Sequence, residues 1–503
     1  QARIYKAWNV PPRDTEAAAH FDLASSVLVG GKNSPLYKEL VYDKQIATDV
    51  SAFYYDREIA GMFFLIVDVV AGEDPASVEK AMDEVMESFI KKGPNRKLLQ
   101  AEKTKALAGF IRGIQRIGGF GGKSDLLATC QTYTANPGCY RENAKYLDEV
   151  TPAKMKATFA KWIDDTPYVL TILPNEKLGV NEAGIDRSQG VPYPTEKVSF
   201  KFPTLQTATL SNGAKVVLAQ RSGVPLIEMN FQFNFGYAQE NNDELGYTNF
   251  MMDMLNEGTK KYSSLQFDEV LDSLGSNLGF GSGLDTSYAT VSSLKANLSE
   301  TLDLAREALI NPTFPQNEID RIKKQTLASI VQEENRPAAI AYRNIGKLLY
   351  GEEHPYGKPL TGSGISETIS DITRDDVIAV HNRAINPANL TFAVAGDIGL
   401  DELVEVLEDK FGDWSSNANS DLKKLSTVAL PNTRTVYLID KPNAQQSYIV
   451  AGQLLPPSAT DEEIKISYMN YAIGGGFTAR LNMNLREDKS WSYGVRTRLS
   501  DAK

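Results

Sequence analysis

The opening fifty residues of this 503-residue chain are repeated near its end. When the sequence is shifted against itself by 445 positions, at least ten residues coincide in one ungapped alignment of 1–50 with 446–495. The identities include Pro11-Pro12 with Pro456-Pro457, Gly30-Gly31 with Gly475-Gly476, and Asp43-Lys44 with Asp488-Lys489. A repeat of this kind indicates a structural unit that the chain uses more than once, so a fold assigned to one copy must suit the other.

A second, weaker repeat links the middle of the chain to its first part. At a shift of 222 positions, the matched positions are Thr151 with Thr373, Met155 with Val377, and Ile163 with Ile385. In both stretches a threonine precedes an amphipathic helical pattern, and a proline-containing turn leads into an apolar strand pattern. The repeats therefore predict a unit of roughly 220 residues.

These repeats divide the chain into four segments. We expect an α+β domain at 1–176, a linker at 177–200 that is rich in Gly, Pro and charge, a further α+β domain at 201–425, and the start of another at 426–503. Asn212-Gly213 predicts a β-hairpin. Strand and helix patterns alternate without Rossmann glycines, so the predicted fold class is α+β, with repeated mixed-sheet domains and helices packed on one face.

Charge and apolar patterning exclude two classes of protein. The net charge of -11 argues against a nucleic-acid surface, because phosphate binding requires clustered Lys and Arg. The longest apolar run, 61–72, contains Asp68 and is too short to cross a bilayer, so it predicts a buried strand.

The chain has two cysteines, Cys130 and Cys139, separated by nine positions. Two interpretations stay open: a pair of unlinked thiols, or a local disulfide in an exported protein. The second interpretation slightly favours an exported or periplasmic location over the cytoplasm.

One segment, Gly246 to Thr259, is similar to the zinc helix of the pitrilysin/insulinase (M16) peptidases, in which an inverted H-x-x-E-H motif lies between a Gly and a closing G-T. Asn249 and Asp253 occupy the two histidine positions, and Met252 occupies the position of the catalytic glutamate. Zinc peptidases of this type need two imidazoles and a carboxylate base. We therefore expect this chain alone to bind no zinc and to cleave no peptide.

Further motifs support the resemblance: Leu210 to Gly213, His354 to Gly357, and Asn389 to Asp397. It implies a LuxS/mitochondrial-processing-peptidase-like metallohydrolase fold, in which two homologous halves enclose a cavity. On this comparison 1–176 is the second domain of the first half, 201–425 is the third domain with the degenerate zinc motif, and 426–503 begins the fourth. The expected zinc-bearing domain would precede Gln1, and roughly 125 residues would follow Lys503.

The resemblance also implies two substrate-binding residues, Arg486 and Tyr493. They match the Arg and Tyr of the family's L-R-E-x-x-x-x-x-Y-x-V segment, which reach across the cavity to the substrate. Arg can donate two hydrogen bonds to a peptide carbonyl, and a phenol can donate one to a developing oxyanion. In the first copy of the repeat, Val41 and Thr48 stand at these positions, so packing alone does not require the pair.

Other polar and glycine-rich features favour structural interpretations. His20, His354 and His381 lack partners at ligand spacing, and Glu333 and Glu334, near the family's third-ligand position, are expected to be solvated. The glycine clusters at 118–122 and 279–283 lack the lysine and spacing of phosphate loops, so tight turns are expected.

Three functions remain open. The favoured one is the non-catalytic, cavity-forming and peptide-binding part of an M16 zinc metalloendopeptidase. The alternatives are an inactive subunit or structural relative that complements a separate zinc-bearing chain, and a stand-alone peptide-binding module. The expected partners are a peptide substrate and a zinc-bearing domain in cis or in trans. A homodimer is possible, and no zinc or other cofactor is expected in this chain.

Overall fold

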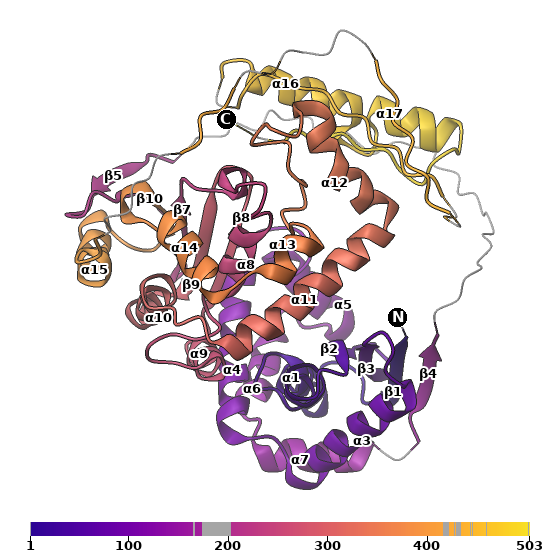
Figure 1. Ribbon diagram of the computed structural model, residues 1–503. Helices are drawn as coiled ribbons and strands as arrows, with labels where there is room; N and C mark the ends of the chain where they lie inside the picture. The colour runs from indigo at the N-terminus through magenta and orange to yellow at the C-terminus, as the bar shows by residue number, and fades with distance from the viewer. Residues whose placement is uncertain are drawn as a thin grey trace, which may run out of the picture.

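The computed structural model describes residues 2–163, 166–173, 203–415, 422–426, 428, 434–442, 444, 446–458, 460–500 and 502. Two β-sheets, one from residues 3–172 and one from residues 206–396, organise the chain, and each has its own hydrophobic core (Figure 1). The predicted linker at 177–200 lies outside the described residues, and the predicted domain boundaries stay predictions.

Sheet A has four antiparallel strands in the order β2-β3-β1-β4. They are β1 (Arg3–Val10), β2 (Ala47–Tyr55), β3 (Gly61–Val69) and β4 (Tyr168–Ile172). The apolar run that begins at Gly61 forms β3, where buried and half-buried side chains alternate as a pleated strand with one core face requires. The predicted strand is therefore confirmed.

Helices α1 (Glu16–Val29), α3 (Pro75–Lys92) and α7 (Pro152–Trp162) contribute to the core of sheet A. Phe159 centres this core, with ring centroids 4.8 Å from Phe21 and 5.6 Å from Phe63. Burying each such side chain stabilises the fold by roughly 1.5–3 kcal/mol. The other helices here are α2 (Pro35–Tyr37), a π-helical segment (Lys38–Asp43), α4 (Arg96–Gly113), α5 (Lys123–Thr134) and α6 (Tyr140–Asp148).

Sheet B has six strands in the order β5-β6-β10-β7-β9-β8, and the β6–β10 pair is parallel. The strands are β5 (Gln206–Thr209), β6 (Lys215–Gln220), β7 (Leu226–Phe233), β8 (Asn277–Ser282), β9 (Ser287–Leu294) and β10 (Leu390–Gly396). The predicted hairpin at Asn212-Gly213 joins β5 to β6, and Gly213 has a φ of 90° that suits glycine.

The helices around sheet B enclose the larger core, in which Phe231, Phe392 and Phe411 meet. They are α8 (Tyr247–Asp253), α9 (Ser264–Ser273), α10 (Leu298–Ile310), α11 (Gln316–Asn335), α13 (Ser366–Asp371), α14 (Arg374–Ala384) and α15 (Leu400–Phe411). Helix α12 (Pro337–Tyr350) follows α11 and packs outside this core. Short 3-10 turns lie at Tyr237–Gln239, Lys295–Asn297 and Pro387–Asn389.

The two sheets share a strand order. Sheet A runs β2-β3-β1-β4, and the corresponding strands of sheet B run β8-β9-β7-β10, with antiparallel pairing throughout both sets. The helices before β4 and β10 begin at the predicted threonines, because Thr151 accepts the Lys154 N–H and Thr373 accepts the Asp376 N–H. Sheet B adds the hairpin β5–β6 beside β10.

Polar contacts join the two sheet-centred units. Lys32 donates to Glu257 at 2.8 Å and to Ser264 at 2.9 Å, and Tyr42 donates to Glu318 at 2.7 Å. Glu257 and Glu318 are themselves buried and both contact Arg321. The junction is therefore a buried charge network in which every charge has an opposite partner.

The described residues after 426 contain helices α16 (Glu463–Asn470) and α17 (Arg480–Asn482), with π-helical segments at Tyr471–Gly475 and Met483–Asp488, but no paired strand. Shifted by 445 positions, α2 and its π-helical segment fall on α17 and the segment after it. Throughout the described chain, none of the helices has the length and hydropathy of a membrane span.

Candidate functional site

Helix α8 carries the three positions at which the zinc motif is degenerate. It begins after Gly246, whose φ of 94° suits glycine. The buried carboxylate of Glu240 accepts the N–H groups of Gly246 at 2.9 Å and Thr248 at 2.7 Å, so it satisfies two free donors of the helix start. Burial raises the pKa of Glu240 to about 7, against the effect of these two hydrogen bonds.

Asn249 is occupied by structural hydrogen bonds. Its Nδ2 donates to the carbonyl of Gly362 at 2.9 Å, and its Oδ1 accepts the N–H of Ser282 at 3.1 Å. One side chain therefore ties α8 both to the end of β8 and to a loop that follows α12. Gly362 has a φ of 72°, and a Cβ there would overlap Asn249 Nδ2.

Met252 lies in the core of sheet B with no exposed surface. A thioether accepts protons too weakly to act as a general base, and this one has no access to solvent. The position of the family's catalytic glutamate thus serves packing in this chain.

Asp253 differs from the other two because its side chain reaches solvent. Surrounding protein atoms still raise its pKa to about 6, and nearby Glu257 adds to the increase. Glu257 itself is held by Lys32 and Arg321, which keep its pKa below the usual value although burial opposes them. The described residues contain no group of three His, Cys, Asp or Glu that could hold a metal ion. The donors around Asp253 therefore do not fit a zinc site.

Glu333 is not the solvated carboxylate that the sequence predicts. Its Oε2 accepts from Arg343 at 2.8 Å and from Ser363 at 2.7 Å, and Arg343 also donates to the carbonyl of Gly364 at 2.8 Å. This difference from the prediction arises because Arg343, on the helix that follows α11, extends its guanidinium to the end of α11. The network holds the 361–364 loop against α8. Glu334, with 52% of its side chain exposed, is solvated as predicted.

The three histidines make separate structural contacts, as predicted. His354 Nε2 donates to the carbonyl of Ser426 at 3.0 Å, so its Nδ1 can accept the Tyr356 N–H. His381 Nε2 lies 2.9 Å from the carbonyl of Leu309, and burial lowers its pKa. His20 Nδ1 lies 2.6 Å from the hydroxyl of Thr158.

Arg486 and Tyr493 are brought together. The guanidinium carbon of Arg486 lies 5.3 Å from the centre of the Tyr493 ring and 4.9 Å from that of Phe477. Tyr493 is 92% exposed. No hydrogen bond involves its hydroxyl within the described part of the chain. Their role toward substrate stays a prediction.

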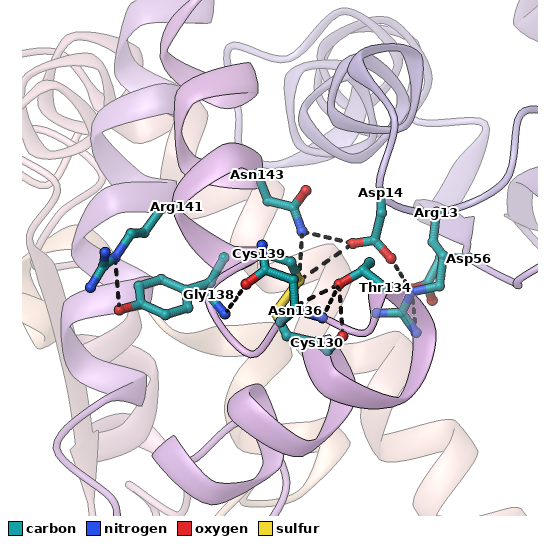
Figure 2. The surroundings of a disulfide bond; sticks show 11 residues. Arg13, Asp14, Asp56, Cys130, Thr134, Asn136, Gly138, Cys139, Arg141 and Asn143 are labelled. Carbon is teal, nitrogen blue, oxygen red and sulfur yellow. Dashed lines mark hydrogen bonds and ion pairs between the residues drawn. A yellow bond between two sulfur atoms is a disulfide. The ribbon is translucent and has the colours of Figure 1, made fainter.

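The disulfide alternative is the one that the structure shows. Cys130 on α5 is bonded to Cys139 at the start of α6 (Figure 2). Asn143 of α6 donates to Asp14 at 2.8 Å, and Arg13 pairs with the other oxygen of Asp14 at 3.0 Å. The helical hairpin is thereby attached to the loop before α1.

Comparison with protein-family models matches 1–106 and 371–503 to the peptidase M16 inactive domain, and 215–363 to the insulinase (peptidase family M16) domain. The chain belongs to the M16 family. The M16 insulinase match contains α8 with its three altered positions, and the M16 inactive-domain match contains Arg486 and Tyr493. The resemblance predicted from the sequence is thus confirmed.

Several M16-related proteins are similar over more than half of this chain. An uncharacterized zinc protease of Mycobacterium leprae is 22% identical over 307 residues, which cover 61% of this chain and 68% of that protein. The uncharacterized zinc protease YmxG of Bacillus subtilis is 23% identical over 57% of this chain and 68% of its own length. A Helicobacter pylori protein called a non-peptidase homolog is 23% identical over 60% of this chain and 70% of its own length.

Solved structures agree on the fold. The M16 inactive domain from Pseudomonas fluorescens superposes with a TM-score of 0.51 at 25% identity, covering 59% of this chain and 71% of that one. A protease from Helicobacter pylori also gives 0.51, at 16% identity, covering 60% of this chain and 72% of that one. The α+β fold is therefore that of M16 inactive-domain proteins.

Proposed function

We propose that this chain is the non-catalytic, cavity-forming and peptide-binding part of an M16 zinc metallopeptidase. A zinc-bearing M16 domain, in cis or in trans, supplies the metal and the general base. This chain contributes walls and substrate contacts. Peptides and unfolded polypeptide segments are the substrate class.

The proposal rests on one observation: the residues at the degenerate motif positions make structural contacts in place of binding zinc. Asn249 bridges Ser282 and Gly362 through both ends of its amide, and Met252 is fully buried. Restoring a histidine and a glutamate there would break these contacts. The helix has therefore kept its architectural role without the residues that chemistry at zinc requires.

The second support is the pair Arg486 and Tyr493. The exposed phenol next to a guanidinium offers three or more N–H and O–H donors on one surface, which suits a peptide carbonyl and its developing oxyanion. In the first copy, Val41 is buried, and Thr48 donates to the carbonyl of Asp68 at 3.3 Å. In the first copy these positions therefore hold a core side chain and a hydrogen bond between β2 and β3, and neither offers a guanidinium or a phenol.

The disulfide supports an exported location. Cys130 and Cys139 are bonded to each other, and disulfides persist in oxidising compartments such as the bacterial periplasm. We therefore place the chain outside the cytoplasm.

Binding without hydrolysis tests the proposal. Fluorescein-labelled, reduced and carboxymethylated α-lactalbumin is an unfolded probe whose anisotropy reports binding and whose size reports cleavage. The purified chain should bind it and leave it intact, with Arg486→Ala weakening binding. Absence of binding, or cleavage that a chelator abolishes, would contradict the proposal.

A further inference from the structure

A cavity of about 320 Å³ opens at the turn between α4 and α5. Its lining includes Gly109, Phe110, Gly113 and Ile114 from α4 and its end, together with Arg116 and Leu126. None of the lining residues belongs to α8 or to the segment that carries Arg486 and Tyr493. Cavities of this size accommodate small ligands or single side chains.

The glycine at 109 keeps this cavity open. Gly109 lies inside α4, where glycine costs about 1 kcal/mol relative to alanine. Packing does not require it, because a Cβ added there would have no heavy atom within 4 Å. One turn later, Gly113 is needed for a different reason, since its Cβ would lie 3.2 Å from the carbonyl oxygen of Gly121. The packing around Gly109 therefore does not explain why glycine stands at this helical position. The only structural consequence of its missing side chain is the open cavity.

The surroundings of the cavity are apolar and exposed. Phe110 in its wall is 38% exposed, and the adjoining turn presents Ile117 at 79% and Phe120 at 93%. Apolar side chains gathered around a concave site on a water-facing surface indicate a ligand that is itself apolar.

Arg116 adds one positive charge to the lining. The side chain is exposed, and it has no ion pair among the described residues. The one acidic residue of the lining, Asp125, is directed to the backbone, since its Oδ2 accepts the Gly121 N–H at 2.8 Å. The guanidinium is thus available for a carboxylate, which it can bind with two parallel hydrogen bonds.

We propose that this cavity binds the C-terminal residue of a peptide, with the apolar side chain inside and the terminal carboxylate on Arg116. A peptide end is the ligand that places a carboxylate beside an apolar side chain on one residue. The inference extends the proposed peptide-binding function to a second site, which requires neither zinc nor Arg486 and Tyr493.

The test uses the full chain and a fluorescein-labelled octapeptide of glycine and serine that ends in leucine, prepared as the free acid and as the amide. Fluorescence anisotropy measures both dissociation constants. The free acid should bind about tenfold more tightly than the amide. Arg116→Gln should remove this difference. Equal affinity of acid and amide for the parent chain, or absence of binding, would overturn the proposal.

Filling the cavity supplies an independent check. Gly109→Leu should weaken binding of both peptides about tenfold while preserving the fold, because leucine favours the helix. Ala128→Leu, at an exposed position of α5 outside the lining, is the matched control and should leave binding unchanged. Unaltered binding by Gly109→Leu would also overturn the proposal, and Gly109→Ala, which should weaken binding less, replaces it if the leucine variant misfolds. The unfolded α-lactalbumin probe tests the proposed function separately. If the parent chain fails to bind that probe but still prefers the free acid over the amide, the proposed function fails and this site stands, so the two failures are distinguishable.

Discussion

Asn249 donates a hydrogen bond of 2.9 Å to the carbonyl oxygen of Gly362, a residue 113 positions away. The same amide accepts from the backbone of Ser282. In an M16 peptidase with an intact motif, the position of Asn249 holds a zinc ligand. In this chain Asn249 connects the 361–364 loop and the end of β8 to α8 by hydrogen bonds, so the motif position has a structural role.

The contact between Asn249 and Gly362 predicts a steric cost for Gly362→Ala. The new methyl group would overlap Asn249 Nδ2 at a φ of 72°, whereas Gly351, with a φ of 88°, has open space around its Cβ. Gly351→Ala should cost about 1–3 kcal/mol from backbone conformation alone, because a ψ of 156° at positive φ is a conformation that side chains other than glycine rarely adopt. Gly362→Ala should cost a further 1–3 kcal/mol or so from overpacking. Urea unfolding measures both. An Asn249→Ala background should reduce the extra cost and leave the part that arises from the Tyr237 ring, 3.1 Å from the added Cβ. Equal costs for the two glycines would contradict the contact.

The charge network at the junction predicts a strong effect for Lys32→Met. Removing the ammonium leaves Glu257 buried with one cation fewer, which should lower the free energy of unfolding by about 3–5 kcal/mol. Lys97→Met is the matched control. Lys97 crosses the same junction to Glu269, but 85% of its side chain is exposed. Such a surface pair contributes about 0–1 kcal/mol. If urea unfolding showed similar losses of unfolding free energy for both variants, the stronger effect expected for the buried ion pair would be refuted.

The raised pKa of Glu240 should make the free energy of unfolding depend on pH. Its pKa rises from 4.5 to about 7 on folding, so the folded state binds more protons than the unfolded state between these values. The unfolding free energy should therefore fall as the pH rises from 4.5 to about 7, by about 3 kcal/mol in total, and change little above that range on this account. Urea unfolding at several pH values should show a shallower decline for Glu240→Gln. An identical slope in the variant would show that another group is responsible.

Tyr493→Phe should impair turnover in a complete enzyme that contains the zinc-bearing domain. Loss of one oxyanion donor typically lowers kcat about 10²–10³-fold, with a smaller change in KM. Arg486→Ala should also weaken peptide binding. Tyr468→Phe, an exposed tyrosine on α16, is the control and should leave kinetics unchanged. If the kcat of the Tyr493→Phe enzyme stays within twofold of that of the parent, Tyr493 has no role in catalysis and only a structural one.

Local sequence signals predicted much of the scaffold. The continuous apolar run at 61–72 predicted β3, Asn212-Gly213 predicted the hairpin, and Thr151 and Thr373 predicted two helix starts. Each of these signals acts within a few residues of its partner.

Local sequence patterns could not predict the contacts around α8, because the residues that meet there are not neighbours within one element. Asn249 meets Gly362, and Glu333 meets Arg343, which lies on the next helix. The buried cap from Glu240 was also missed. The glycines at 362 and 364 were the available signal for a tightly packed loop.

Zinc content per chain is the measurement on which the account depends. The purified full chain, passed over a desalting column and analysed by inductively coupled plasma mass spectrometry, should retain well under about 0.1 zinc per chain, since its motif offers Asn249, Met252 and Asp253 in place of two imidazoles and a base. A fluorogenic peptide added to the same sample should stay intact. One tightly bound zinc per chain, together with cleavage that a chelator abolishes, would contradict the account.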